Sequence, residues 1–259
     1  MRTFDPERFL SVRDEVLSSA RVENGIGTLS EKTLHRILKK YFEPLSALHE
    51  QKLGRYVADI LNEEGVTEIQ TRSLSAMRAK LAAFLSVTHV TLVHPVVHKK
   101  WLTWIDPETG ECTGRRKSPK VGTVYDAFWE LGAIPEYLSH PNLTVHILML
   151  DMEETRLLNG WSKNKKRGST RADRIPTALV KEYRFDTKDD YLGVLPDMLP
   201  DPFTRAELAL LAREPKERMY CVLRVLSAVG VVKEAGKRGR EKLYTVCRDA
   251  QTEENTEEA

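Results

Sequence analysis

Residues 55–72, RYVADILNEEGVTEIQTR, contain the pattern that decides the fold. The first part, residues 55–61, alternates in polarity and is rich in residues that favour β-strands. Asn-Glu-Glu-Gly at residues 62–65 is a turn signal, and residues 66–72 form a second alternating run. The sequence therefore predicts two antiparallel strands joined by a tight turn.

Acidic and amide side chains of this hairpin are predicted to gather at one place. Glu68, Gln70 and Arg72 share one face of the second strand because side chains alternate across a strand. Asp59, on the neighbouring strand, can reach that face. Glu31 lies at the edge of the buried side of a preceding helical pattern. Three carboxylates and one amide are therefore expected to converge.

The sequence on both sides of the hairpin alternates between helical and strand patterns. Apolar residues at helical spacing predict helices over residues 5–20, 29–41, 73–85 and 124–138. Apolar runs predict strands over residues 89–97 and 144–150, and Asp-Pro-Glu-Thr-Gly joins shorter strands over 101–105 and 111–115. This order indicates an α/β fold, with a mixed sheet flanked by helices.

Three prolines, Pro196, Pro200 and Pro202, mark a linker. We therefore expect a larger domain over residues 1–197 and a small domain over residues 203–247. The remaining residues, 248–259, are acidic and polar without apolar content, and a disordered tail is expected there.

The composition excludes several classes of protein. The chain has 259 residues and a net charge of +2, and no apolar run approaches the roughly 18 residues needed to cross a bilayer. Residues 1–10 do not have the pattern of a signal peptide. The three cysteines, Cys112, Cys221 and Cys247, are widely spaced, and we expect neither a disulfide framework nor a zinc site. A reducing cytoplasm and no membrane contact fit these features.

The small C-terminal domain has a recognisable order of elements. Thr204 and Glu207 form a capping box that begins a helix, and a turn at residues 213–215 leads to a second helix that ends at Gly230. Two strands with a basic tip follow to residue 246. The order helix, turn, helix, hairpin resembles the winged helix-turn-helix family over about the last fifth of the chain.

That resemblance implies binding to double-stranded DNA. The second helix would enter the major groove, and the basic hairpin would contact phosphates. A second basic stretch, residues 161–174, has the composition of a nucleic-acid-binding loop. The candidate DNA-binding residues are Lys163, Lys165, Lys166, Arg167, Arg171, Lys216, Arg218, Lys237, Arg238 and Arg240. The alternative interpretation is a protein-interaction module and a solvated basic loop.

The hairpin and its flanking elements, over roughly residues 25–97, resemble the PD-(D/E)XK nuclease superfamily, which has a restriction-endonuclease-like fold. The family core is helix, hairpin-like strands, helix and strand, with an Asp followed one strand later by an acidic-x-Lys triplet. By position, the resemblance implies that Asp59 and Glu68 bind a divalent metal, Mg²⁺ or Mn²⁺, and that Glu31 assists through a water. Gln70 stands where the family usually has Lys, and Ala58 stands where it usually has Pro. Lys80 or Arg72 is then a candidate source of the missing positive charge.

Each acidic residue also has a structural explanation. Glu31 follows Thr28 by three residues, as in a capping box, and Asp59 can bond turn amides. Glu68 and Gln70 can form the solvent face of an edge strand. The joint order of these residues and elements favours metal-dependent DNA cleavage as the function. The alternative is a non-catalytic DNA-binding regulator with a degenerate nuclease fold. Symmetric cutting of both strands would favour a homodimer.

Overall fold

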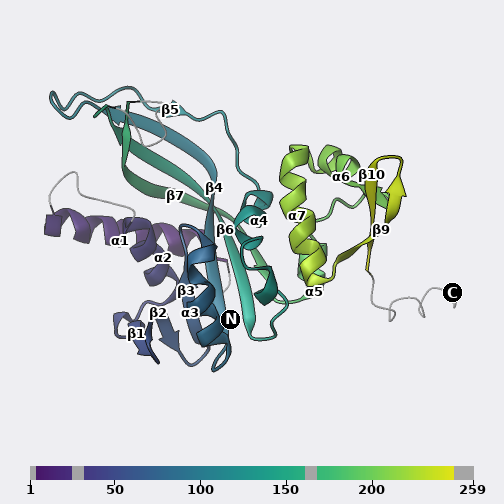
Figure 1. The fold of residues 1–259 in the computed structure, drawn as a ribbon. Helices are drawn as coiled ribbons and strands as arrows, with labels where there is room; N and C mark the ends of the chain where they lie inside the picture. The colour runs from purple at the N-terminus through teal and green to yellow at the C-terminus, as the bar shows by residue number, and fades with distance from the viewer. Residues whose placement is uncertain (1–3, 25–31, 161–167, 248–259) are drawn as a thin grey trace, which may run out of the picture.

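The computed structural model describes residues 4–24, 32–160 and 168–247. Its centre is a mixed sheet of seven strands in the order β1-β2-β3-β4-β6-β7, with β5 paired to β4 (Figure 1). The strands are β1 His49–Leu53, β2 Tyr56–Asn62, β3 Gly65–Ile69, β4 Val90–Ile105, β5 Arg116–Lys117, β6 Leu143–Leu157 and β7 Thr170–Phe185.

Strand direction changes three times along the order from β1 to β7. β1, β2 and β3 are antiparallel to one another in turn, β3 and β4 are parallel, β4 and β6 are parallel, and β7 is antiparallel to β6. The predicted hairpin is therefore confirmed as β2 and β3, with Asn62 opposite Gly65 at its turn. Gly65 has φ +111°, and a Cβ there would lie 2.4 Å from the His89 carbonyl oxygen, so a larger residue would collide with the backbone.

Helices cover both faces of the sheet. They are α1 Pro6–Asn24, α2 Lys32–Phe42, α3 Arg78–Leu85, α4 Ala127–Leu131 and α5 Lys188–Leu192, with short 3₁₀ turns η1 Ser46–Leu48, η2 Leu74–Met77, η3 Val124–Asp126 and η4 Pro135–Tyr137. Alternation along β4 divides its side chains between two cores: Leu92 packs with residues of α3 and α4, and Val93 packs with residues of α1 and α2. The predicted mixed sheet flanked by helices is thus confirmed.

The C-terminal part forms a second, three-stranded sheet in the order β8-β10-β9. Its elements are β8 Phe203–Thr204, α6 Arg205–Ala212, α7 Lys216–Val229, β9 Val232–Arg238 and β10 Glu241–Val246. The predicted capping box is present, since the Glu207 amide donates to Thr204 Oγ1 at 3.2 Å and the Thr204 amide donates to Glu207 Oε2 at 2.6 Å. Gly230 ends α7 at φ +81°, as predicted.

The apolar core continues from the large sheet into this C-terminal part. Val222 and Leu226 of α7 belong to the same buried cluster as Phe128 and Leu131 of α4. The proline-rich stretch before β8 therefore marks a change in composition, but residues on both sides of it share one apolar core. The expected division at residues 197–203 stays a prediction about domains.

The structure differs from the predicted elements in four main regions. β4 runs without a break to Ile105, in place of the two predicted strands over 89–97 and 101–105. Its antiparallel partner β5 begins at Arg116, just after the predicted strand over 111–115, and a single bridge joins Ile105 to Cys112. Residues 124–138 form short helical turns in place of one helix. β1 and β7 were not predicted, because β1 is short and polar and three register shifts between β6 and β7 disturb the alternation of β7. In the described residues, no helix is long and apolar enough to span a membrane.

Candidate active site

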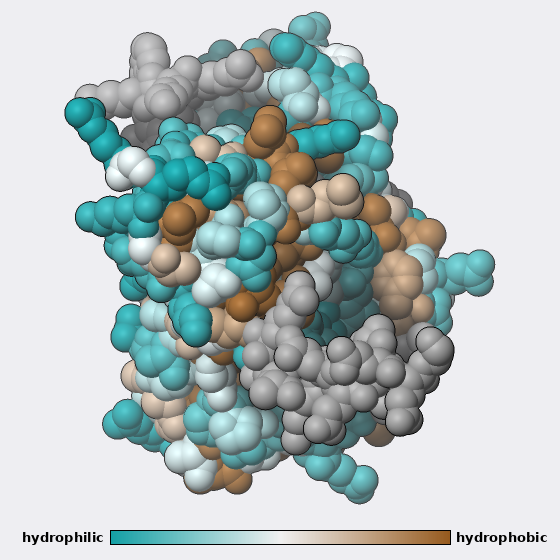
Figure 2. Space-filling model, turned by 90° about the vertical axis from the view of Figure 1, so that its right-hand side faces the viewer, coloured by the Kyte–Doolittle hydropathy of each residue, from teal (hydrophilic) through white to brown (hydrophobic). Residues whose placement is uncertain are grey.

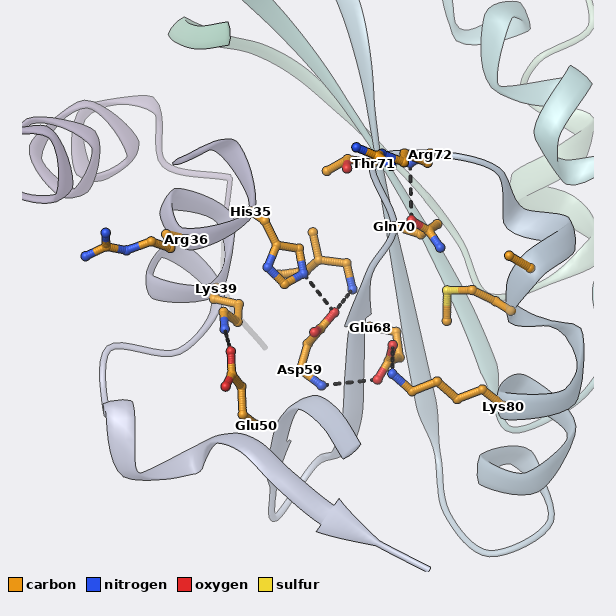
Figure 3. Close-up of a pocket in the computed structure, with 13 residues that line it drawn as sticks. His35, Arg36, Lys39, Glu50, Asp59, Glu68, Gln70, Thr71, Arg72 and Lys80 are labelled. Carbon is orange, nitrogen blue, oxygen red and sulfur yellow. Dashed lines mark hydrogen bonds and ion pairs between the residues drawn. The ribbon is translucent and has the colours of Figure 1, made fainter. Parts of the chain in front are cut away.

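A pocket of about 680 Å³ lies where β2 and β3 separate, between α2 and α3 (Figure 3). Main-chain pairing of β2 with β3 extends from the turn to Ile60 and Thr67. Beyond that pair, hydrogen bonds to side chains replace the main-chain hydrogen bonds between the two strands. The polar residues that line the pocket are His35, Arg36 and Lys39 of α2, Glu50, Asp59, Glu68, Gln70, Thr71, Arg72, and Lys80 of α3.

Asp59 and Glu68 connect the two strands through their side chains. The Asp59 amide donates to Glu68 Oε1 at 3.1 Å, and the Ile69 amide donates to Asp59 Oδ2 at 2.8 Å. Each carboxylate thus accepts from the partner strand, which fixes both groups at the mouth of the gap. The structure therefore brings together the two acids that the sequence placed on neighbouring strands.

Lys80 supplies a cation directly to this pair. Its Nζ lies 2.6 Å from Glu68 Oε2, and the Glu68 side chain is only 3% exposed. Burial and the nearby Asp59 charge raise the pKa of Glu68 to about 7, although Lys80 acts in the opposite direction. Glu68 is therefore a carboxyl group that changes charge near neutral pH, which is uncommon outside functional sites.

Asp59 has the opposite electrostatic character. Burial raises its pKa, but the hydrogen bond and charge of His35 and the Ile69 amide outweigh burial, so the pKa of Asp59 lies below its usual value. His35 Nε2 lies 3.1 Å from Asp59 Oδ2. The pKa values of these two neighbouring carboxyl groups are displaced in opposite directions. Asp59 therefore carries the negative charge of the pair, and Glu68 gains or loses a proton near pH 7.

Two exposed arginines, Arg36 and Arg72, and one ion pair lie at the rim of the pocket. Lys39 Nζ lies 2.6 Å from Glu50 Oε1, and the Lys39 side chain is 9% exposed while that of Glu50 is 70% exposed. Glu50 has φ +53°, a backbone conformation that is unfavourable for a residue with a side chain. Gln70 Oε1 accepts from the Arg72 amide at 3.2 Å, so the side chain of Gln70 is bonded to the backbone of the rim.

The predicted catalytic residues are placed as follows. Asp59, Glu68 and Gln70 line one pocket, and Lys80 rather than Gln70 contacts Glu68. Glu31 lies outside the described residues. The sequence did not predict His35 and Lys39, although His35 follows Glu31 by four residues, the spacing expected of neighbours on one side of a predicted helix. That spacing was the available signal.

The candidate DNA-binding residues are dispersed. Lys163, Lys165, Lys166 and Arg167 lie outside the described residues, and the rest of the predicted basic loop begins strand β7, with Arg171 near Glu154. In the C-terminal part, Lys237 and Arg240 are exposed, Lys216 pairs with Glu241, and Arg238 pairs with Glu207 at 2.6 Å.

Arg218 differs from its expected orientation. As a candidate DNA-binding residue on the second helix it was expected to face outward, but its guanidinium lies 2.5 Å from Glu214 and 3.1 Å from Asp126. Only 24% of the side chain is exposed. α7 packs against η3, α4 and η4, and this packing turns its Arg218 side toward the larger sheet. Arg218 therefore contributes to internal packing.

The donors for a metal ion are few. Within residues 4–24, 32–160 and 168–247, no group of three or more His, Cys, Asp and Glu side chains is arranged to hold a metal ion. Three carboxylates line the pocket: Asp59 and Glu68 lie next to each other, and Glu50 pairs with Lys39.

Comparisons with known proteins give one family and one relative. The family described as Domain of unknown function (DUF8091) matches residues 32–186, which include every described residue of the pocket. An uncharacterized protein of Treponema pallidum is 29% identical over 222 residues, covering 85% of this chain and 86% of that protein. No solved structure matches the chain.

Proposed function

The chain belongs to the DUF8091 family, and we propose that its pocket hydrolyses phosphodiester bonds of double-stranded DNA with Mg²⁺ or Mn²⁺. One observation carries the proposal: Asp59, Glu68 and Lys80 converge where β2 and β3 separate. Two carboxylates and a cation are the set that hydrolysis of a phosphodiester requires, namely metal ligands and a positive charge near the phosphorus.

The order of elements supports a nuclease-like fold. The chain passes from α2 through antiparallel β1, β2 and β3, then through α3 to β4, which is parallel to β3. This is the order helix, hairpin strands, helix and strand that the resemblance to the PD-(D/E)XK superfamily implies. Asp59 and Glu68 occupy the two acidic positions of that pattern.

The donor set fits a divalent cation. Mg²⁺ is commonly bound by one or two carboxylates, with waters and substrate phosphate oxygens as the other ligands. Burial and the charge of Asp59 raise the pKa of Glu68, and a cation between the two carboxylates would remove their mutual repulsion. When bound, the metal would lower the pKa of a ligated water and neutralise charge at the phosphate.

The protein side chains have separate roles in this proposal. Lys80 replaces the charge that Gln70 lacks, since its Nζ is already at Glu68. His35 holds Asp59 ionised and oriented through Nε2, so it is a positioning residue. The exposed basic residues that line the pocket, Arg36 and Arg72, would attract the phosphates that flank the cleaved bond.

The C-terminal part is proposed to be a winged helix that holds the DNA. A second hollow of about 360 Å³ lies between α7 and the hairpin, lined by Arg205, Tyr220, Arg240, Glu241, Lys242 and Tyr244. Three of these six residues are basic, and two are tyrosines. Such a surface supports contacts to phosphates.

A protein-binding role for the same part has its own support. Leu210 of α6 is 76% exposed and Tyr220 of α7 is 60% exposed. Figure 2 shows the side of the molecule on which α6 and α7 lie, where apolar residues gather among hydrophilic ones. Exposed apolar surface is typical of contacts with other proteins.

Incubation of the purified full chain with varied duplexes and Mg²⁺ or Mn²⁺ tests the proposal. We expect cleavage that requires the metal and is lost in Asp59→Ala. DNA binding without cleavage would support the non-catalytic regulator instead. Absence of salt-dependent DNA binding would support the protein-interaction module, and cleavage that survives in Asp59→Ala would place the chemistry elsewhere.

A further inference from the structure

Three strands of the large sheet continue beyond the region that the helices cover. β4, β6 and β7 have 16, 15 and 16 residues, whereas β3 has five and ends at Ile69, opposite Val93 of β4. Figure 1 shows the far ends of the three long strands projecting past α1. We name this projection the arm and define it as residues 99–105, 152–157 and 170–176.

Basic side chains from all three strands of the arm surround one buried carboxylate. Glu154 of β6 is 1% exposed. Arg156 Nε lies 2.7 Å from its Oε1, while Lys100 Nζ of β4 and Arg171 Nε of β7 lie 3.2 and 3.6 Å from its Oε2. Arg174 Nε lies 3.7 Å from the same Oε2. The register explains the cluster, because Glu154 is opposite Leu102 on one side and Arg174 on the other.

The cluster carries more positive charge than Glu154 can neutralise. Lys100, Arg156 and Arg171 alone place three positive charges around one negative charge. The surrounding cations outweigh the effect of burial and hold the pKa of Glu154 below its usual value, so it stays ionised and anchors their side chains. Lys100, Arg156 and Arg171 still expose 25%, 24% and 44% of their side chains. The anchored cations therefore remain accessible to an external anion.

The arm begins next to the candidate active site. The Gln70 amide donates to the Val93 carbonyl oxygen at 2.9 Å, and His94 Nδ1 lies 2.7 Å from the Gln70 carbonyl oxygen. From Val93 to Leu102, the neighbour of Glu154, β4 advances nine residues, or about 30 Å. This corresponds to about nine base pairs of a duplex, at roughly 3.4 Å per step.

We propose that Lys100, Arg156 and Arg171 bind the phosphate backbone of a DNA duplex whose other end reaches the pocket. Glu154 orders these cations in advance, so less side-chain freedom is lost on binding. The inference rests on the proposed function for the identity of the partner. It adds a second contact, about nine base pairs from the site of cleavage, that does not depend on the C-terminal part.

The test compares variants of the full chain by fluorescence anisotropy on a labelled 30-base-pair duplex over a series of salt concentrations. The arm variant is Lys100→Gln/Arg156→Gln/Arg171→Gln, and the matched control is Lys52→Gln/Lys120→Gln/Lys181→Gln, which removes the same charge from exposed positions outside the cluster. We expect the arm variant to lose affinity roughly 10- to 100-fold near 0.15 M salt and to lower the salt slope by up to about three phosphate contacts.

A single substitution tests the same contact in case the triple variant does not fold. Arg171 is the most exposed of the three cations, so Arg171→Gln should fold normally and lower the salt slope by about one contact, while Lys181→Gln should not. On duplexes shorter than about nine base pairs, the difference between the arm variant and its control should disappear.

Equal affinities and salt slopes for the arm variants and their controls would overturn the inference, even if the wild type binds and cuts DNA. If the arm variants bind weakly and the wild type does not cut, the proposed hydrolysis fails while the arm contact stands. A wild type that shows no salt-dependent duplex binding would overturn both.

Discussion

The pocket and the C-terminal part handle charge in opposite ways. In the pocket, Glu68 is 2% exposed and its pKa is raised to about 7 by burial and by Asp59. In the C-terminal part, Lys216 pairs with Glu241 and Arg238 pairs with Glu207, and these side chains are between a third and just over half exposed. The same residue types are thus coupled strongly in one region and weakly in the other.

The difference follows from solvent. Water screens the exposed pairs, so each contributes little to stability and can exchange its partner for a DNA phosphate at little cost. Burial removes that screening in the pocket, so each group there changes the protonation of its neighbour. We therefore expect substitutions in the pocket to change chemistry strongly, and substitutions in the C-terminal part to change binding moderately.

The largest expected effect is loss of cleavage on removal of either acid. Asp59→Ala and Glu68→Ala should each lower the cleavage rate by about 1,000-fold or more, because each removes a metal ligand. Binding to a duplex in the absence of metal should stay within about threefold of wild type, since the exposed cations are untouched. Single-turnover cleavage and anisotropy measure the two quantities. Equal losses of cleavage and binding would contradict the view that the pocket performs the chemistry and the exposed cations perform the binding.

The next effect concerns the cation at Glu68. Lys80→Gln should lower cleavage about 100-fold and move the rising part of the pH–rate profile to higher pH, because Lys80 lowers the pKa of Glu68. Gln70→Lys should restore part of the rate in that variant, since it returns a cation to the position usual in the resembled family. A shift of the profile to lower pH would contradict the assigned role of Lys80.

A third effect is on stability and needs no substrate. The folded-state pKa of Glu68 lies above its ordinary value of 4.5, so between about pH 4.5 and 7 the folded state binds the proton more tightly than the unfolded state. Stability should therefore fall as pH rises through this window, by up to about 3 kcal/mol from this group. Glu68→Gln should remove that fall in denaturant titrations, whereas Glu63→Gln, in the exposed turn, should leave it unchanged.

The smallest effect is expected at the tip of the β9–β10 hairpin. Lys237→Ala/Arg238→Ala/Arg240→Ala should weaken duplex binding by roughly tenfold, similarly for different DNA sequences, and should lower the salt slope by up to about three contacts. Cleavage at saturating DNA should not change. An unchanged salt slope in anisotropy titrations would remove this hairpin from the DNA interface.

The sequence was sufficient where the physical signal is local. Alternation and a glycine turn predicted β2 and β3, and the spacing of Thr204 and Glu207 predicted the start of α6. Alternation also placed Asp59 and Glu68 near each other, because neighbouring strands in a hairpin have a defined register. These predictions needed no knowledge of how distant elements pack.

The parts that were missed depend on packing between distant elements. His35 meets Asp59 only because α2 crosses the sheet at that point, and Arg218 turns inward only because α7 packs beside Asp126. β7 was missed because it is an edge strand with register shifts, so its alternation is broken. Local patterns cannot indicate these arrangements, since the same patterns occur on solvated helices and loops.

The parallel pairing of β4 with β6 has a consequence for how the chain is made. Val90 pairs with Leu143, more than fifty residues later in the chain. At a synthesis rate of 5–20 residues per second, β4 waits roughly 3–10 s for its partner. Throughout that interval the apolar, β-branched first half of β4 has β3 on one edge, and the edge that β6 will occupy is open. Residues 90–97 are therefore an aggregation-prone open edge during synthesis until β6 is made.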